Sequence, residues 1–481
     1  MLPSDLIPSP GGLVDGRWTG ADSGASFPVH NPVQGELLAE APAMTGRDAE
    51  RAIAAAAAAL QQPSSLADRQ GWLRRIGESL RARREELGRI ITLEHGKPLA
   101  EGVAEVEYAA GFFLHYADRL EALGTHALPE PLRGCRWEVR HRPAGVVGLI
   151  TPWNFPLAML AKKASAALAA GCAAVVKPAS LTPLSALALG SLYLAAGVPR
   201  GLLNLLPGPA GPIADALCSD PLVRLLSFTG STEVGVLLAR NAAPHGKRLT
   251  LELGGNAPFL VFPDADLDAA AAALVANKFR AGGQTCVCTN RVYVQRDVRE
   301  PFVERVATRV AALRVGDGMV EGTDIGPLVN RAAMAKVAAH VRDARHRGAV
   351  RLVGGDPPLP DADWGCFYPP TLLVGVRPEM LVCREETFGP VLAVADFATE
   401  QEALAAANDT QYGLAAYVFT ADEHRAERCV RELAFGHVGV NTGTGPTPEA
   451  PFGGLKSSGY GREGGLEGLL EYCETQTVVR G

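Results

Sequence analysis

The pattern of hydrophobic and polar residues changes period along the chain, and the region after residue 145 shows this most clearly. The short apolar run GVVGLI predicts a buried strand, and LAMLAKKASAALAAG predicts a helix that ends at Gly171. AAVVK then predicts the next strand, and strands and helices continue to alternate after it. This alternation predicts parallel βαβ units, and therefore an α/β fold with an open, doubly wound sheet.

The segments outside this region predict helices and an excursion of two strands. An alanine-rich helix is expected at 48–60, with Thr45 and Asp48 as its cap, and the Arg- and Glu-rich stretch 72–99 predicts a pair of solvated helices. PEPLRGCRWEV (129–139) contains prolines and then alternates like a strand, which predicts a hairpin. LLEYCETQTVV near the C-terminus alternates as well, and we expect its strand edge to pair between subunits.

Composition limits the class of protein. A length of 481 residues suggests about three domains, and 47% hydrophobic with 20% charged residues is ordinary for a globular protein. The net charge of -6 gives no basic field, so we expect neither nucleic acid nor a membrane as a partner. Apolar runs such as 164–176 are shorter than the ~20 residues of a membrane span.

The N-terminus and the cysteines indicate the compartment. MLPSDLIPSP resembles neither a signal peptide nor a transit peptide, which predicts a cytoplasmic protein. The nine cysteines are scattered and odd in number, as in a reduced protein. The ten histidines form no cluster with metal-ligand spacing, so no metal site is expected.

Ligands of an open parallel sheet bind beyond the carboxyl ends of its strands, and three such ends stand out. GVVGLI runs into TPWNFP, AAVV runs into KPAS, and VRLLSF runs into TGSTEVG. The last segment should open a helix whose free N–H groups suit a phosphate. GYGREG (459–464) matches the dinucleotide pattern Gly-x-Gly-x-x-Gly, but it follows no strand of a βαβ unit, and we interpret it as a loop coincidence.

A thiol and a carboxylate lie in glycine-rich segments. FRAGGQTCVCTN sets Cys286 among small residues, and LELGGNAP presents Glu252 on a turn. The pair suggests covalent catalysis followed by hydrolysis. Taken alone, a cysteine is more often buried and inert, and a glutamate beside glycines is often a cap. Two other classes stay open: a thiol hydrolase without cofactor, although no histidine lies near the motif, and a non-catalytic binding protein.

Seven motifs occur in an order and at a spacing that resemble the aldehyde dehydrogenase superfamily over nearly the whole chain: TPWNFP, KPAS, SFTGSTEVG, LELGGNAP, GGQTCVC, REETFGP and PFGGLKSSGYGREGG. QTCVCTN, GLAAYVF and VGVNTG are most similar to succinate-semialdehyde dehydrogenases. The resemblance implies a Rossmann-type cofactor domain at 1–124 and 144–253 and an α/β catalytic domain at 254–452. It also implies a β oligomerisation arm at 125–143 with a C-terminal segment at 453–481, in a homodimer or homotetramer.

The resemblance implies a reaction in which the Cys286 thiolate adds to an aldehyde and forms a thiohemiacetal. The Asn154 side chain and the Cys286 backbone N–H would stabilise the oxyanion. Hydride would pass to a nicotinamide, and Glu252 would activate the water that hydrolyses the resulting thioester.

The resemblance also implies which residues contact the cofactor. Position 180 holds Ser, where NAD-preferring relatives often have Glu, and Lys177 lies close by, so we expect NADP to be preferred over NAD. Glu386 should bind the nicotinamide ribose and Phe388 should pack near the ring. The remaining expected contacts are Trp153, Gly230, Ser231 and Leu253.

The expected substrate is succinate semialdehyde. Arg280 matches one of two arginines that bind the distal carboxylate in the similar enzymes, while the other aligns with Lys162, which lacks the bidentate fork. A substrate-binding hydroxyl falls near Thr447. Glutarate semialdehyde and a less polar aldehyde are the alternative substrates. Cys288 could form a reversible disulfide with Cys286, or it could be simply a second small thiol.

Overall fold

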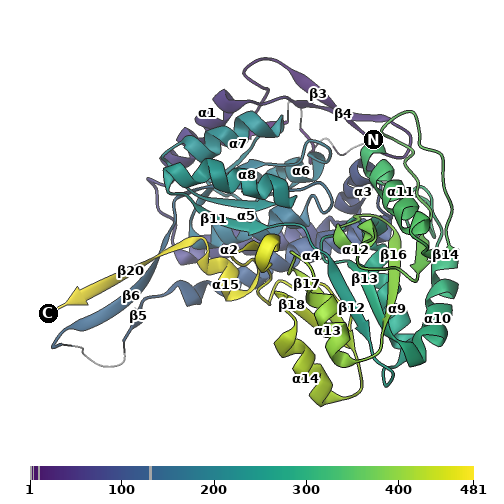
Figure 1. Cartoon of the computed structure of the whole chain (residues 1–481). Helices are drawn as coiled ribbons and strands as arrows, with labels where there is room; N and C mark the ends of the chain where they lie inside the picture. The colour runs from purple at the N-terminus through teal and green to yellow at the C-terminus, as the bar shows by residue number, and fades with distance from the viewer. Residues whose placement is uncertain (1–2, 4, 9–10, 129–132) are drawn as a thin grey trace.

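The computed structural model describes residues 3, 5–8, 11–128 and 133–481 (Figure 1). A sheet of eight strands in the order β19-β11-β10-β7-β8-β9-β1-β2 organises the first half of the chain. Its five central strands are parallel, and every residue of β7 and β8 is buried, as expected for a sheet covered by helices on both faces. The strands are β1 (Gly12–Val14), β2 (Arg17–Thr19), β7 (Val146–Ile150), β8 (Ala173–Lys177), β9 (Leu203–Leu205), β10 (Val223–Thr229), β11 (Arg248–Glu252) and β19 (Gly459–Tyr460).

Helices cover this sheet, and the predicted ones are present with shifted ends. The alanine-rich helix begins at Gly46, and the Thr45 N–H donates to the Asp48 carboxylate at 2.8 Å, which confirms the predicted cap. The predicted pair at 72–99 is confirmed as two helices, although one face of each packs inward and is not solvated. The helices are α1 (Gly46–Ala59), α2 (Leu66–Ala82), α3 (Arg84–His95), α4 (Leu99–Ala117), α5 (Ala158–Ala170), α6 (Leu184–Ala195), α7 (Ala210–Ser219) and α8 (Thr232–Ala242).

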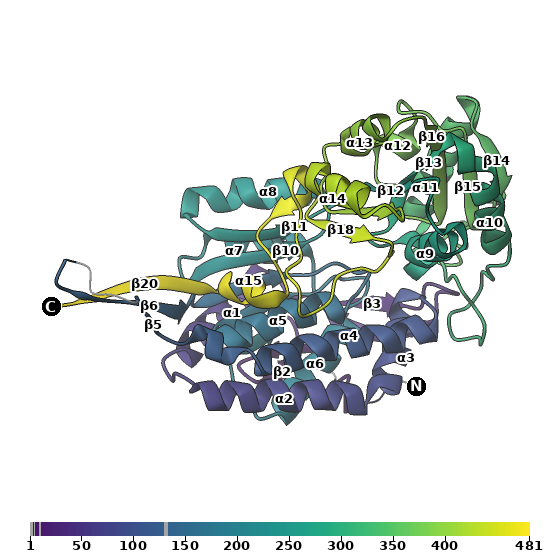
Figure 2. The same ribbon diagram turned by 90° about the horizontal axis from the view of Figure 1, so that it is seen from below.

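A second sheet, of seven strands, forms a separate lobe in Figure 2. Its order is β14-β15-β16-β13-β12-β17-β18, and only the pairing of β14 is antiparallel. The strands are β12 (Ala257–Val261), β13 (Thr289–Gln295), β14 (Val350–Val353), β15 (Thr371–Val374), β16 (Val391–Phe397), β17 (Ala415–Phe419) and β18 (His437–Val440). The helices are α9 (Leu267–Phe279), α10 (Arg299–Ala311), α11 (Arg331–His346), α12 (Leu381–Arg384), α13 (Glu400–Asn408) and α14 (Glu423–Glu432).

A three-stranded arm leaves the body of the molecule (Figures 1 and 2). It consists of β5 (His126–Ala127), β6 (Arg136–Pro143) and β20 (Cys473–Arg480), with the antiparallel register Cys473↔Pro143 to Arg480↔Arg136. β20 confirms the strand predicted near the C-terminus. Part of the expected hairpin, 129–132, lies outside the described residues.

Two smaller elements complete the fold. β3 (Ser26–His30) and β4 (Leu37–Pro42) form a hairpin, and α15 (Gly465–Leu470) packs against α5. Among the described residues, no helix is long and apolar enough to cross a membrane. The carboxyl ends of β7, β10 and β11 point to the region between the two sheets, where the site lies.

Candidate active site

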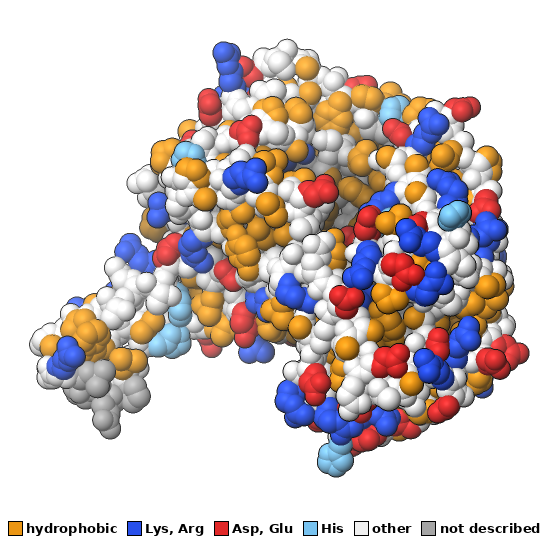
Figure 3. All heavy atoms as spheres, in the orientation of Figure 1, with side chains coloured by type: hydrophobic (Ala, Val, Ile, Leu, Met, Phe, Trp, Pro, Cys, Tyr) orange, Lys and Arg blue, Asp and Glu red, His pale blue; other side chains and the backbone are white. Residues whose placement is uncertain are grey.

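A cavity of about 370 Å³ lies between the two lobes, and Figure 3 shows a hollow in the middle of the face drawn there. Segments far apart in the sequence line it, because the strand ends of the first sheet face loops of the second lobe. Those segments include 152–155 after β7, 229–231 at the end of β10, 252–254 at the end of β11, 285–287 before β13 and 386–388 after α12.

A strained turn places Cys286 in this cavity. Ala281, Gly282 and Gly283, which follow α9, have φ angles of 50°, 64° and 76°. A Cβ atom on Gly283 would lie 2.3 Å from the carbonyl oxygen of Gly389, so only glycine fits there. The Glu101 carboxylate accepts the Ala281 N–H at 2.8 Å and so holds the turn from the side of α4.

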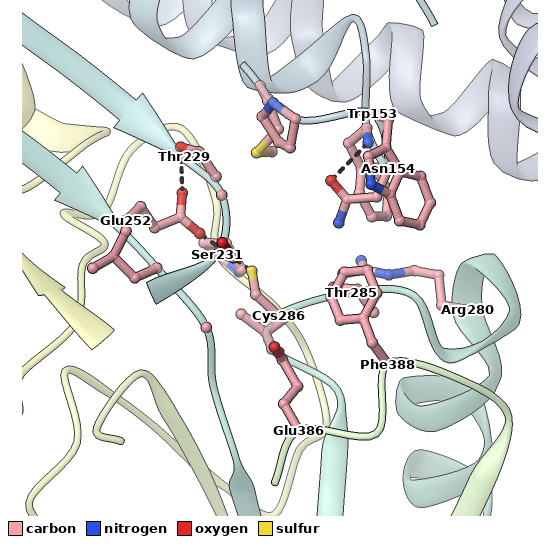
Figure 4. Close-up of a pocket in the computed structure, with 18 of the residues that line it drawn as sticks. Trp153, Asn154, Thr229, Ser231, Glu252, Arg280, Thr285, Cys286, Glu386 and Phe388 are labelled. Atoms are coloured by element: carbon pink, nitrogen blue, oxygen red, sulfur yellow. Dashed lines mark hydrogen bonds between the residues drawn. The ribbon is translucent and has the colours of Figure 1, made fainter. Parts of the chain in front are cut away.

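Cys286 and Glu252 lie next to each other in Figure 4, and the thiol donates to Glu252 Oε1 at 3.2 Å. Burial raises the pKa of the Cys286 thiol well above its usual value, and the negative charge of Glu252 adds to this increase. Lys162 acts in the opposite direction. The resting cysteine is therefore a thiol, and its hydrogen-bond partner is also the nearest base.

Glu252 belongs to a buried network of four charges. Its Oε2 atom lies 2.5 Å from Lys162 Nζ and accepts the Thr229 hydroxyl at 3.3 Å. Lys162 also forms an ion pair with Glu463, which in turn pairs with Lys163. Lys162 therefore lines the cavity, but its ammonium already contacts two carboxylates.

Asn154 lies on the far side of the open space from Glu252 in Figure 4. Its Nδ2 donates to the Gln284 carbonyl at 2.9 Å, and its Oδ1 accepts the Phe155 N–H at 3.1 Å. The Asn154 carbonyl accepts from Lys97 at 2.7 Å, and Lys97 is paired with Glu105 at 2.6 Å. An amide NH₂ has two donors, so one N–H of Nδ2 serves the loop and the other suits a ligand oxygen.

The sequence placed Lys177 and Ser180 together, and the structure does so as well. Lys177 Nζ lies 2.5 Å from the Pro178 carbonyl and 3.4 Å from Ser180 Oγ, which donates to the Gly208 carbonyl at 2.7 Å. Burial lowers the pKa of Lys177 to about 8. Both residues lie outside the cavity lining: Lys177 is the last residue of β8, and Ser180 follows in the loop after it.

The residues near α8 and α12 fit a dinucleotide. Ser231 caps α8 and accepts the Val234 N–H at 3.3 Å, which leaves N–H groups of the first turn for a phosphate. Glu386 accepts the Gly255 N–H at 3.1 Å, and burial raises its pKa to about 7. Such a carboxylate suits ribose hydroxyls. The Phe388 ring packs edge-on to Trp153 at 5.7 Å between centroids; Gly230 and Leu253 complete this end of the cavity.

The predicted substrate residues are only partly brought together. Arg280 lines the cavity, and its guanidinium lies 5.2 Å above the centre of the Phe155 ring. Thr447 is exposed and donates to the Glu449 carboxylate, whereas its neighbour Pro446 lines the cavity. Thr447 therefore lies beside the cavity lining and not in it, and its contact with the substrate stays a prediction.

The thiol of Cys288 has partners other than Cys286. It is buried, donates to the Gly283 carbonyl at 3.4 Å, and lies 3.5 Å from Lys278 Nζ. Both thiols are free. A disulfide between them would require the turn to rearrange.

The comparison with known families decides what kind of protein carries this site. The sequence model of the aldehyde dehydrogenase family matches residues 18–478. The chain belongs to this family. It is therefore an oxidoreductase that oxidises aldehydes, with NAD+ or NADP+ as the family's hydride acceptor.

Individual relatives of this aldehyde dehydrogenase carry more specific names. The succinate-semialdehyde dehydrogenase (NADP+) of Escherichia coli is 45% identical, covering 98% of this chain and 97% of its own. The glutarate-semialdehyde dehydrogenase of Pseudomonas aeruginosa is 44% identical over 97% of both chains. The crystal structure of succinate-semialdehyde dehydrogenase from Burkholderia pseudomallei superposes with a TM-score of 0.96 at 45% identity, covering 100% of this chain and 99% of that one. The predicted fold and family are confirmed.

The sequence did not reveal every residue that this dehydrogenase brings to the site. Glu463 lies within the GYGREG segment that we interpreted as a loop coincidence, and Gly459–Tyr460 of that segment joins the first sheet as β19. Tyr108 of α4 lines the cavity, and burial raises its pKa to about 12. Lys97, in the loop between α3 and α4, and Glu105 of α4 were missed as well, since no local pattern shows that both are buried.

Proposed function

We propose that this dehydrogenase oxidises succinate semialdehyde to succinate and prefers NADP+ to NAD+. The observation that carries the substrate assignment is Arg280, a cation on the cavity wall whose flat guanidinium stacks on Phe155. Arginine in this arrangement binds a carboxylate through two parallel hydrogen bonds. The name of the Escherichia coli relative supports both parts of the proposal.

The first step uses the contact between Cys286 and Glu252. The thiol proton passes from Sγ to Glu252 Oε1, and the thiolate adds to the aldehyde carbon to give a thiohemiacetal. The Asn154 amide and the Cys286 backbone N–H would donate to the oxyanion. A bound nicotinamide would serve as the hydride acceptor.

The second step hydrolyses the thioester on Cys286. Glu252 first releases its proton to solvent and then takes a proton from the attacking water. The hydroxide adds to the thioester carbonyl, the C–S bond breaks, and the departing thiolate recovers a proton. The carboxylic acid leaves and Cys286 returns to the thiol form.

Glutarate semialdehyde is the second candidate. It is one methylene longer, and a relative of this chain is named for it. The cavity offers one stacked arginine for the distal carboxylate, so chain length would be selected by distance from Cys286 and not by a second cation. A methylene in a pocket changes kcat/KM by about 10- to 200-fold, which a kinetic comparison resolves.

The cofactor preference is supported by charge at the end of β8. Ser180 leaves room for a 2′-phosphate, and Lys177 lies 3.4 Å from its hydroxyl. An acidic residue at position 180 would repel the phosphate instead.

We also propose a cytoplasmic homodimer or homotetramer. In the arm, β20 pairs with β6 on one side, and its other edge has no strand partner within the described chain. Pairing with a second copy would cover this edge. The mass of the native enzyme by light scattering should equal two or four chains.

The experiment that tests the substrate assignment compares three aldehydes by the absorbance of the reduced cofactor. Succinate semialdehyde, glutarate semialdehyde and butanal are each assayed with NADP+ and NAD+, and Cys286→Ala serves as the blank. We expect the carboxylate-bearing aldehydes to exceed butanal in kcat/KM by at least about tenfold, since a charged hydrogen bond is worth about 1.5–3 kcal/mol. A tenfold advantage of butanal would refute the carboxylate site.

A further inference from the structure

The ammonium of Lys162 is held by two carboxylates at the edge of the cavity. Lys162, from the second turn of α5, lies 2.5 Å from Glu252 Oε2 at the end of β11. On another side it pairs with Glu463, from the loop before α15. The side chains of Lys162 and Glu252 are each 3% exposed, so water does not replace these contacts.

The charges of this cluster balance only while Glu252 is ionised. Lys162 and Lys163 supply two positive charges, and Glu252 and Glu463 supply two negative ones. A buried carboxylate without a cation is unfavourable and takes up a proton instead. Without Lys162, two carboxylates would share the single ammonium of Lys163, which contacts Glu463 and Ser227.

The charge balance of this cluster also disfavours the binding of a substrate carboxylate by Lys162. To bind the carboxylate of a substrate, the Lys162 ammonium would have to break its contact with Glu252, or contact a third carboxylate in addition to Glu252 and Glu463. Burial alone would lower the pKa of Lys162, but Glu252 and Glu463 raise it well above its usual value, so the ammonium is committed to these two partners. Arg280 lies over the Phe155 ring, and no ion pair of its guanidinium is found within the described residues, although the charge of Glu101 acts on it; this suits an incoming anion.

We infer that Lys162 is a positioning residue that holds the ionised Glu252 carboxylate against the Cys286 thiol, and that Arg280, without Lys162, binds the distal carboxylate of the substrate. The first part depends only on the cluster. The second part deepens the proposed function and rests on it.

Besides Glu252, several titratable groups lie around Lys162 and Cys286 and belong to any pH profile of the site. Tyr108 approaches from α4, Lys163 from α5, and Glu463 from the loop before α15. Glu386 acts on the thiol of Cys286 from the side of α12. A change in the profile must therefore be assigned with variants that alter Lys162 alone.

The first test needs neither aldehyde nor cofactor. The rate at which iodoacetamide alkylates Cys286 is measured from pH 6 to pH 10 in the wild-type enzyme, in Lys162→Met and in Lys162→Arg, with Lys247→Met as a control for the loss of one lysine elsewhere. We expect Lys162→Met to be alkylated at least about tenfold more slowly at pH 7.5, with its profile moved to higher pH by at least about one unit. The alkylation rate of Lys162→Arg, which keeps the charge, should stay within about threefold of the wild-type rate. The rate of Lys247→Met should equal the wild-type rate.

The second test separates positioning from substrate binding. Lys162→Met should lower kcat for succinate semialdehyde and for butanal by a similar factor and leave the ratio of their KM values unchanged. Arg280→Met should instead raise KM for succinate semialdehyde by at least about tenfold and leave butanal within about threefold.

An unchanged alkylation profile in Lys162→Met, together with a tenfold rise in KM for succinate semialdehyde alone, would overturn the inference. If Lys162→Met does not fold, as judged by circular dichroism, Lys162→Gln replaces it, and the comparison with Lys162→Arg decides in the same way. If butanal proves the better substrate of the wild-type enzyme, the proposed function fails, while the alkylation test still decides the role of Lys162.

Discussion

The Cys286 thiol donates a hydrogen bond of 3.2 Å to Glu252, and the other oxygen of that carboxylate lies 2.5 Å from Lys162. The nucleophile is therefore linked through its base to a buried ion cluster, although cysteine, glutamate and lysine come from three distant segments. A thiol with a raised pKa needs such a base, because only the thiolate attacks an aldehyde.

Replacing the nucleophile should remove oxidation and spare cofactor binding. Cys286→Ala should lower kcat with succinate semialdehyde to the limit of detection, because no thiohemiacetal forms. The Kd for NADP+, measured by isothermal titration calorimetry, should stay within about threefold of wild type, since the thiol makes no hydrogen bond to the residues assigned to the cofactor. Substantial turnover by the variant would exclude Cys286 as the nucleophile.

Cofactor affinity should fall as the pH drops through about 7. Burial raises the pKa of Glu386 to about 7, and its ionised form is the better acceptor for ribose hydroxyls. The carboxylate is charged above this pKa and protonated below it, so Kd for NADP+ should rise between pH 8 and pH 6. In Glu386→Gln the Kd should be weaker at pH 8 and nearly independent of pH over this range. A wild-type Kd that does not change would argue against a ribose contact by Glu386.

The choice of cofactor should depend on position 180. Ser180→Glu places a carboxylate beside Lys177 and repels a 2′-phosphate, so the ratio of kcat/KM for NADP+ to that for NAD+ should fall by at least about tenfold. Ser180→Gln, of the same size without the charge, is the matched control and should shift the ratio less. Equal ratios in wild type and Ser180→Glu would count against the NADP assignment.

The turn that carries the thiol should tolerate no side chain at Gly283. Gly24 and Gly283 have φ angles of 70° and 76°, but a Cβ atom meets nothing within 4 Å at Gly24 and lies 2.3 Å from the Gly389 oxygen at Gly283. Gly24→Ala should cost about 1–2 kcal/mol of unfolding free energy from its backbone alone. Gly283→Ala should cost about 1–3 kcal/mol more and lose activity. Denaturant unfolding of both variants measures the difference, and equal losses would mean that the turn can move away.

Much of this site could be predicted because its residues lie in segments whose local sequence indicates their structure and chemistry. The glycines around Cys286 and Glu252 permit a substrate to approach these side chains closely. β7, β8 and β10 are recognisable in the sequence as short apolar runs between helices. The strand ends then identify the edge of the sheet where the residues that follow them meet.

The remaining part depended on contacts that no local pattern carries. Lys162 was expected at the substrate carboxylate from its position in a motif, but Glu463, about 300 residues later, shares its ammonium. Thr447 follows the cavity-lining Pro446 in sequence, but its own side chain is exposed, which depends on the path of the loop. Burial of Lys97 and Glu105 likewise depends on how α4 and the loop before it pack, which local sequence does not specify.

The most direct measurement of the central claim traps the acyl group on the thiol. Glu252→Gln retains Cys286 but lacks the base of both steps, so the incubation is run at pH 9 and long enough for the thiol to ionise without Glu252, while deacylation should still slow by about 10²–10⁴. The variant is incubated with succinate semialdehyde and NADP+, quenched in acid, digested and analysed by mass spectrometry. The account predicts one succinyl group per chain on the peptide that contains Cys286, formed together with one equivalent of NADPH. NADPH formation without that adduct, or an adduct on another residue, would contradict it.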